Sequence, residues 1–170
     1  RDKPRYRGVG DVYKRQVYAL GRNPFPSAVE KLVSLLETDD NAYVRRATAW
    51  SLANYDNQIV LKPLINSLKN DVAAVRLWSS SSLAEIGSTS SFNAQLAAEQ
   101  LLISLKIDNE PVVRSNCIWS LCRLFEKLNE ISQESFVDEC TKIALFDKEP
   151  SVMEEAKTAL DSMGMKGFYK

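Results

Sequence analysis

The sequence repeats one pattern four times, and this repetition limits the folds open to the chain more than any other feature. Segments 28–55, 59–87, 97–125 and 136–164 align on a single Val, and in every copy a Leu follows eight residues later. The aligned valines are Val44, Val75, Val113 and Val152, and the leucines are Leu52, Leu83, Leu121 and Leu160. Repeats of this length are typical of proteins built from stacked helical hairpins.

Apolar residues recur with helical spacing inside each copy. In the first copy, Val29, Leu32 and Leu36 fall on one side of a helix, a polar turn follows at 38–41, and a second helix contains Val44. Positions four, seven, eight and eleven residues after each aligned Val share its side of the second helix and are predicted core. Seven or eight residues before each aligned Val stands another Leu, and these are Leu36, Leu68, Leu105 and Leu145. Because no segment alternates with period two, we predict an all-α fold, an α-solenoid (α-α superhelix) of about four helical hairpins.

Several residues mark the expected ends of these helices. Asn41, Asp71 and Asn109 are predicted to cap second helices, and Gly87 and Gly164 to end them. Ser27 and Glu30 have the spacing of a capping box. Residues 88–93 and 129–133, which lengthen two of the spacings, are interpreted as loops inserted between copies.

Residues 1–16 do not follow the repeat. The string DVYKRQ at 11–16 matches the translation of a transposon end used in shotgun DNA libraries, and RGVG before it is close to the adjoining adapter. We therefore interpret residues 1–16 as a sequencing-adapter artefact that is not native. Residues 17–170 are then the repeat domain, truncated at its N-terminus, with 17–21 as the tail of an earlier second helix. The alternative for 1–16 is a natural basic arm that binds nucleic acid.

Composition and charge exclude several kinds of function. The 170 residues include no histidine, which removes the commonest general base and most catalytic zinc sites. Residues 17–170 hold 16 basic and 20 acidic side chains, a net charge of −4, so nucleic acid is not an expected partner. No apolar run is long enough for a membrane span.

The three cysteines, Cys117, Cys122 and Cys140, are predicted to be structural. Each lies in an apolar helical stretch, and no two have the spacing of a metal site, so no metal is expected. A reactive thiol is the alternative. Unpaired cysteines suit a reducing compartment, and we predict a cytoplasmic location.

Three strings carry a resemblance to a known family: AVEKLV, YVRRATAWSLA and AVRLWSSSSLA. They resemble HEAT repeats, which form an armadillo-like superhelix, and most closely the cyanobacterial E/F-type phycobilin lyase family. The resemblance covers residues 17–164. It implies work on the phycobilisome, with a phycobilin as substrate rather than as a tightly bound cofactor, and attachment of that bilin to a cysteine. The implied partner is a phycobiliprotein subunit or a partner lyase chain.

Three tryptophans are candidate binding residues. Trp50 and Trp119 both lie six residues after the aligned Val, off the core side of their helices, while Trp78 lies on a flank. We interpret the first two as an aromatic stripe on the concave face of the solenoid. The alternative is that they pack against adjacent repeats as ordinary core.

An arginine directly follows three of the four aligned valines. These residues are Arg45, Arg76 and Arg114. We interpret them as a ladder in which each arginine pairs with a turn aspartate of a neighbouring repeat, and the expected partners are Asp40, Asp71 and Asp108. The alternative is that they bind an anion, such as the propionate of a bilin.

Three functional hypotheses follow from these residues and the resemblance. The chain is a binding scaffold of the lyase family that assists bilin attachment, or a bilin lyase that acts with a partner chain. The third hypothesis is a general adaptor, unrelated to pigments, that binds a peptide or protein in its groove. The residues assign no catalytic group, so whether the chain is an enzyme stays open. Metal-dependent hydroxylases of the HEAT class are disfavoured because such di-iron sites need histidine.

Overall fold

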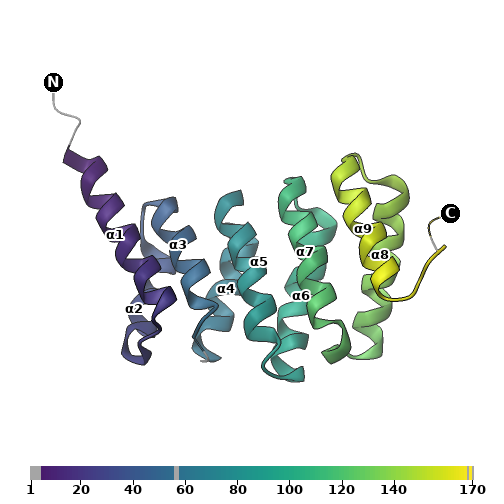
Figure 1. The fold of residues 1–170 in the computed structure, drawn as a ribbon, viewed down its shortest axis with the longest axis horizontal. Coiled ribbons are helices and arrows are strands. Elements are labelled where there is room, and N and C mark those ends of the chain that lie inside the picture. The colour runs from purple at the N-terminus through teal and green to yellow at the C-terminus, as the bar shows by residue number, and fades with distance from the viewer. Residues whose placement is uncertain (1–4, 56–57, 168, 170) are drawn as a thin grey trace. The chain divides into compact units, whose positions relative to one another are not determined.

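All regular elements in the described part of the chain are helices. The computed structural model describes residues 5–55, 58–167 and 169, with side chains from residue 12 onward. The α-helices (Figure 1) are α1 Arg5–Arg22, α2 Val29–Thr38, α3 Ala42–Leu52, α4 Leu61–Asn70, α5 Ala73–Gly87, α6 Ser91–Ile107, α7 Pro111–Leu124, α8 Glu130–Phe146 and α9 Pro150–Ser162. Short 3-10 helices are η1 Pro26–Ala28, η2 Gln58–Val60 and η3 Phe125–Lys127. The predicted all-α fold is confirmed.

The chain divides into two compact units, Arg1–Ile86 (unit 1) and Gly87–Lys170 (unit 2). In unit 1, α1 packs against α3, and α2 contacts both α3 and α4. The Ser82 hydroxyl of α5 donates a hydrogen bond to the Ala49 carbonyl of α3 at 2.7 Å, which joins these two helices. In unit 2, α6 packs on α7 and α8 on α9, while α6 also contacts α8 and α7 contacts α9. Within each unit, the first helices of the hairpins (α2, α4, α6, α8) therefore pack on each other, and so do the second helices (α3, α5, α7, α9).

The predicted core side of the second helices is confirmed. The aligned valines are buried, and the positions four, seven, eight and eleven residues later are buried in all but one case. The exception is the half-buried Met163. The same register therefore places the short polar side chains of Ser51, Ser82 and Ser120 in the interior. Ser51 and Ser82 donate to main-chain carbonyls there, which satisfies their buried hydroxyls.

Of the four leucines that align in the first helices, three are buried and one is not. Leu145 is exposed, whereas Ala144 is buried. Ala144 lies three residues before Asp147, the same distance that separates Leu36 from Asp39 in the first copy. The turn aspartate is therefore the better reference for the end of a first helix than the Val that follows it.

The inserted segments lengthen helices instead of forming the expected loops. Ser90 caps α6 by accepting a hydrogen bond from the Asn93 N–H, and Asn129 caps α8 by accepting one from the Ser132 N–H. Each helix therefore begins directly after its cap and extends to 17 residues. Most residues of the two predicted loops belong to these first turns.

The predicted helix ends are confirmed in part: α5 does end at Gly87, but the cap residue of α7 is Glu110 and not Asn109. The Asn41 side chain accepts a hydrogen bond from the Tyr43 N–H at 2.9 Å and caps α3. Gly164 follows the end of α9 with φ of +79°, a conformation that favours glycine. The capping box at residues 27–30 is wrong, because η1 occupies the entry to α2 and the cap residue Ala28 has no side-chain acceptor.

The predicted helix tail at 17–21 exists as the end of α1. Val17 is buried, and the helix ends at Arg22. α1 also extends back through residues 5–16, while residues 1–4 lie outside the described part of the chain. The adapter interpretation concerns the origin of residues 1–16 and stays a prediction.

Candidate functional site

The outer flank of α3 carries two aromatic side chains and an arginine. Val44 and its partners face the interior, so residues one before and six after Val44 lie on the other side of the helix. Tyr43 is exposed there, and the Arg46 guanidinium carbon lies 5.6 Å from the centre of its ring, within cation–π range. Trp50, one of the candidate binding residues, lies six residues after Val44 and is half-buried.

Trp50 packs against the neighbouring helix. Its ring meets that of Tyr18 on α1 edge to face, with 5.2 Å between the centroids. A Cβ added at Gly21 of α1 would lie 2.6 Å from Trp50 Cζ3. The indole therefore fits into a space that only a glycine leaves open, which supports the packing alternative for this tryptophan.

The flank of α7 carries an equivalent stripe that is more open. Val112 and Trp119 occupy the same two positions relative to Val113 as Tyr43 and Trp50 do relative to Val44, and both are exposed. Trp119 exposes 41% of its surface. The Arg123 guanidinium carbon lies 5.6 Å from the centre of the indole ring. We call Val112, Trp119 and Arg123 the α7 stripe.

The third candidate tryptophan differs from both. Trp78 lies on α5 and is half-buried. The position of α5 that corresponds to Trp50 and Trp119 holds Ser81, also half-buried. The α5 helix of unit 1 thus has no aromatic side chain at this register position.

Arg45 forms an ion pair with the turn aspartate of the next repeat. Its Nε and Nη2 donate to the two carboxylate oxygens of Asp71, each at 2.7 Å, and Nη1 donates to the Asp39 carbonyl at 2.7 Å. The hydrogen bonds to Asp71 raise the pKa of Arg45. Burial tends to raise the pKa of Asp71, but the hydrogen bonds from Arg45 and the Val72 N–H outweigh it, so that pKa lies below its ordinary value. The predicted ladder is confirmed here.

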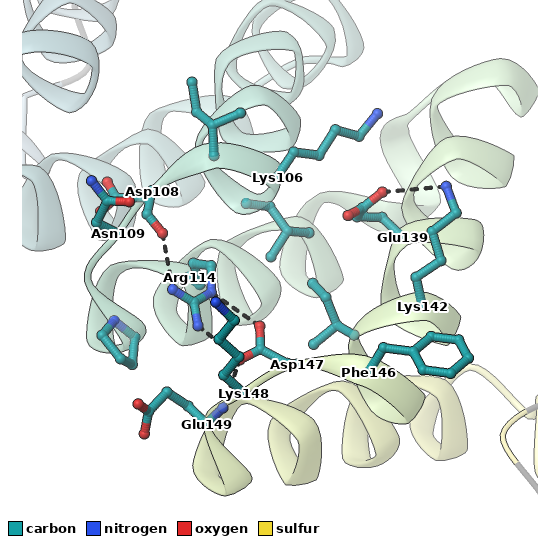
Figure 2. Close-up of a pocket in the computed structure, with 14 residues that line it drawn as sticks. Lys106, Asp108, Asn109, Arg114, Glu139, Lys142, Phe146, Asp147, Lys148 and Glu149 are labelled. Carbon is teal, nitrogen blue, oxygen red and sulfur yellow. Dashed lines mark hydrogen bonds and ion pairs between the residues drawn. The ribbon is translucent and has the colours of Figure 1, made fainter.

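Arg114 repeats this geometry in unit 2 (Figure 2). Its Nε and Nη2 donate to the Asp147 carboxylate at 3.1 and 2.8 Å, and Nη1 donates to the Asp108 carbonyl at 2.9 Å. Burial tends to raise the pKa of Asp147, but the hydrogen bonds from Arg114 and the Glu149 N–H lower it overall. Both arginines thus join successive repeats, which supports the structural interpretation over anion binding.

The list of expected aspartate partners changes at Asp147 and Asp40, and Asp108 contacts Arg114 through its main-chain carbonyl. Asp147 was missed because the fourth copy has Met153 where the others have arginine, although its aspartate stands at the usual place in the turn. Asp40 forms no hydrogen bond with Arg45 and contributes only its nearby charge. Arg76 donates to the main-chain carbonyl of Asp71 at 2.8 Å, so that aspartate serves arginines of two repeats.

Open pockets lie beside these ion pairs, where the turns of two successive hairpins meet. One lies in unit 1 and one in unit 2, each with a volume of about 470 Å³. We call them the turn-edge pockets. The unit 2 pocket is lined by residues of α6 and α8, the first turn of α7 and the turn before α9 (Figure 2).

The cysteines are buried or half-buried in unit 2. Cys117 and Cys140 are buried, and Cys122 is half-buried. Burial raises the pKa of the Cys122 thiol to about 11, with a contribution from the charge of Glu155, and burial also raises the pKa of Cys140. Thiols held in the protonated form are poor nucleophiles, which supports the structural interpretation.

The described residues were also searched for a metal site and for a membrane-spanning helix. No three or more His, Cys, Asp or Glu side chains among them gather in a way that could hold a metal ion. None of the helices within residues 5–55, 58–167 and 169 combines the length and apolar character of a membrane span.

Stacked hairpins whose successive turns are joined by Arg–Asp pairs define an α-solenoid. A family model described as HEAT repeats matches residues 10–84 and 29–122, and the chain belongs to this family. This match does not confirm the resemblance to the phycobilin lyases.

A search of the solved structures found similar folds, and one of them is a designed armadillo repeat protein in complex with the peptide (KR)4. The TM-score is 0.60 at 17% sequence identity, over 98% of this chain and 86% of that one. The likeness confirms the predicted solenoid fold. A search of curated proteins found no match.

Proposed function

We propose that the chain is a repeat scaffold that binds a peptide or protein partner, with the α7 stripe as the contact surface in unit 2. The observation that carries the proposal is the exposure of Trp119 beside Arg123. Tryptophan and arginine are the side chains most enriched among the dominant residues of protein interfaces. A monomer that leaves a large indole in water gives up the free energy of burying it, which a partner can recover.

The two stripes are not equivalent in this role. Trp50 already packs on Tyr18 and over Gly21 of α1, so a partner would gain less new buried area there. The role therefore falls mainly on Trp119. Arg45 and Arg114 do not contribute, because their N–H groups are already engaged by carboxylates and carbonyls of the turns.

The class of scaffold supports this proposal. The designed armadillo repeat protein of similar fold holds a peptide. A solenoid presents a regular series of helix flanks, which suits a long, shallow contact better than an enclosed catalytic site.

The experiment is a selection of peptides from a displayed library against the whole chain. Selected peptides should lose about tenfold or more in affinity for Trp119→Ala, since removing a buried aromatic contact costs about 1.5–3 kcal/mol. The matched control is Ile131→Ala, which removes another exposed apolar side chain, on α8. Peptides whose affinity is the same for Trp119→Ala and Ile131→Ala would contradict the proposal, as would a failure to select any peptide.

A second candidate is the handling of a phycobilin with a phycobiliprotein subunit or a partner lyase chain. It rests on the family resemblance of the repeat strings and on the pairing of Trp119 with Arg123, because an indole can stack on a pyrrole ring and a guanidinium can bind a propionate. Co-expression with bilin synthesis tests it. The candidate predicts a visible absorbance band that Trp119→Ala reduces, and an unchanged band would assign the binding elsewhere.

A cytoplasmic location remains part of the proposal. It is supported by the three cysteines, which are unbridged. A disulfide found in protein purified from its source would contradict it.

A further inference from the structure

The turn edge of unit 2 is apolar where that of unit 1 is polar. The residue before each turn aspartate, the last of its first helix, is Thr38 or Asn70 in unit 1. In unit 2 it is Ile107 or Phe146, and these side chains expose 71% and 78% of their surface. Nothing in the packing of a hairpin requires an apolar side chain here, since unit 1 forms the same turns without one.

Ile107 and Phe146 line the same turn-edge pocket of about 470 Å³. They come from α6 and α8, which contact each other, so they flank the pocket from two neighbouring helices. The buried Ile143 also lines the pocket. So does the Arg114–Asp147 pair (Figure 2). A space of this size between two apolar side chains accommodates a large apolar side chain from a partner.

Lysines stand on the helix side of this pocket. Lys106 precedes Ile107, and Lys142 lies one turn before Phe146. The ammonium of Lys142 is 3.6 Å from Glu139 but remains largely exposed, while Lys106 and Lys148 have no ion pair among the described residues. Glu149 lies on the opposite, turn side of the pocket. Asp108 and Asp147 also line the pocket, and Asp147 is paired with Arg114, so basic and acidic side chains are equal in number. The local positive charge next to the exposed apolar surface comes from the lysines on the helix side.

The turn-edge pocket of unit 1 is more acidic, with four acidic side chains against Arg45 alone. It is lined by Glu37, Asp39 and Asp40, and Glu37 occupies the position that corresponds to Lys106. An acidic partner would be repelled there and attracted to unit 2, so the charges select one of two similar pockets.

We propose that the turn-edge pocket of unit 2 docks an acidic peptide segment of another protein, which inserts one large apolar side chain between Ile107 and Phe146. Burial of the two exposed side chains supplies affinity, and Lys106 and Lys142 select acidic residues on either side of the inserted one. This site is separate from the α7 stripe, and the inference does not depend on the function proposed for it.

Two short fluorescent peptides test the inference on the whole chain, one with a central Leu-Phe flanked by glutamates and one flanked by lysines. Fluorescence anisotropy should show saturable binding of the glutamate peptide only. The double variant Ile107→Thr/Phe146→Asn, which introduces the residues of unit 1, should weaken that binding about tenfold or more. Lys106→Glu should weaken it too, and this loss should shrink at high salt.

Ile131→Thr is the matched control, since it removes an apolar side chain that is 78% exposed at the other end of α8. Trp119→Ala should also leave glutamate-peptide binding unchanged, which keeps this test apart from that of the proposed function. Equal binding of the two peptides, no binding of the glutamate peptide, or equal loss in Ile131→Thr would overturn the inference. If the chain self-associates and the double variant Ile107→Thr/Phe146→Asn abolishes this self-association, the occupant of the pocket is a second copy of the chain and the inference is overturned.

Discussion

The Arg45–Asp71 pair should contribute measurably to stability because it is shielded from water. The side chains expose only 17% and 11% of their surface, and two hydrogen bonds of 2.7 Å join them. Asp71 also accepts a hydrogen bond from the Val72 N–H at 2.7 Å. The substitution Asp71→Ala removes all three acceptor contacts and leaves the Arg45 guanidinium with the Asp39 carbonyl as its described partner.

The expected loss follows from these contacts. Hydrogen bonds to charged groups contribute about 1.5–3 kcal/mol when buried, and residual exposure places this pair near the lower end. Loss of the hydrogen bond from the Val72 N–H adds about 1 kcal/mol, by analogy with helix caps. We therefore expect Asp71→Ala to lower the free energy of unfolding by about 2–3 kcal/mol, with about 1–2 kcal/mol of this as coupling between the two side chains.

A double-mutant cycle measured by urea denaturation tests this coupling. The variants are Asp71→Ala, Arg45→Met, which keeps much of the aliphatic stem, and the two together, followed by circular dichroism. The Glu154–Lys157 ion pair on α9 is the matched control, because its side chains are more exposed. Its Lys157 Nζ lies 3.5 Å from Glu154 Oε2. Its coupling should stay at or below about 0.5 kcal/mol. Equal coupling in the two cycles would refute the argument that burial makes the repeat-joining pair strong.

The same pair gives a pH dependence of defined sign. The pKa of Asp71 in the folded protein lies below its ordinary value of 3.8, so its contribution to stability is present above that value. The contribution is lost as pH falls through the lower, folded-state pKa. The wild type should therefore lose more stability than Asp71→Ala between about pH 5 and pH 2. Parallel curves for the two proteins over that range would contradict this linkage.

Three further predictions address the core and the thiols. Leu83→Ala should lower the free energy of unfolding by about 2–5 kcal/mol by opening a cavity at a fully buried site, and a loss below about 1 kcal/mol in urea would mean that the repeat register is wrong. Gly21→Ala should cost about 1–3 kcal/mol despite the better helix propensity of alanine, because its Cβ would clash with Trp50; an unchanged melting temperature would contradict the close packing. Cys122 should react with a thiol reagent at pH 8 roughly 100-fold more slowly in the folded than in the unfolded chain, and Cys140, whose pKa burial also raises, should be slowed as well; equal rates would contradict the raised pKa values.

The sequence could predict the solenoid because each repeat carries its own core register. Val75, Ser79, Ser82 and Leu83 are all buried in α5, although two of them are polar, since helical geometry fixes which positions face the neighbour. The ends of the first helices were less predictable. Leu145 had the right chemistry for the core, but the start of the next turn at Asp147 fixes the rotation of α8 and buries Ala144 instead.

The candidate site was harder to predict because exposure depends on what the neighbouring helix supplies. Trp50 and Trp119 occupy the same register position, yet α1 brings Tyr18 and the small Gly21 against Trp50. Trp119 has Arg123 over its ring and remains 41% exposed. Helical periodicity places a side chain on a flank, but the size of the residues on the adjacent helix decides whether that flank is closed. A single tryptophan at this register position therefore does not predict an exposed site. The prediction also needs the size of the residues that face it from the preceding second helix.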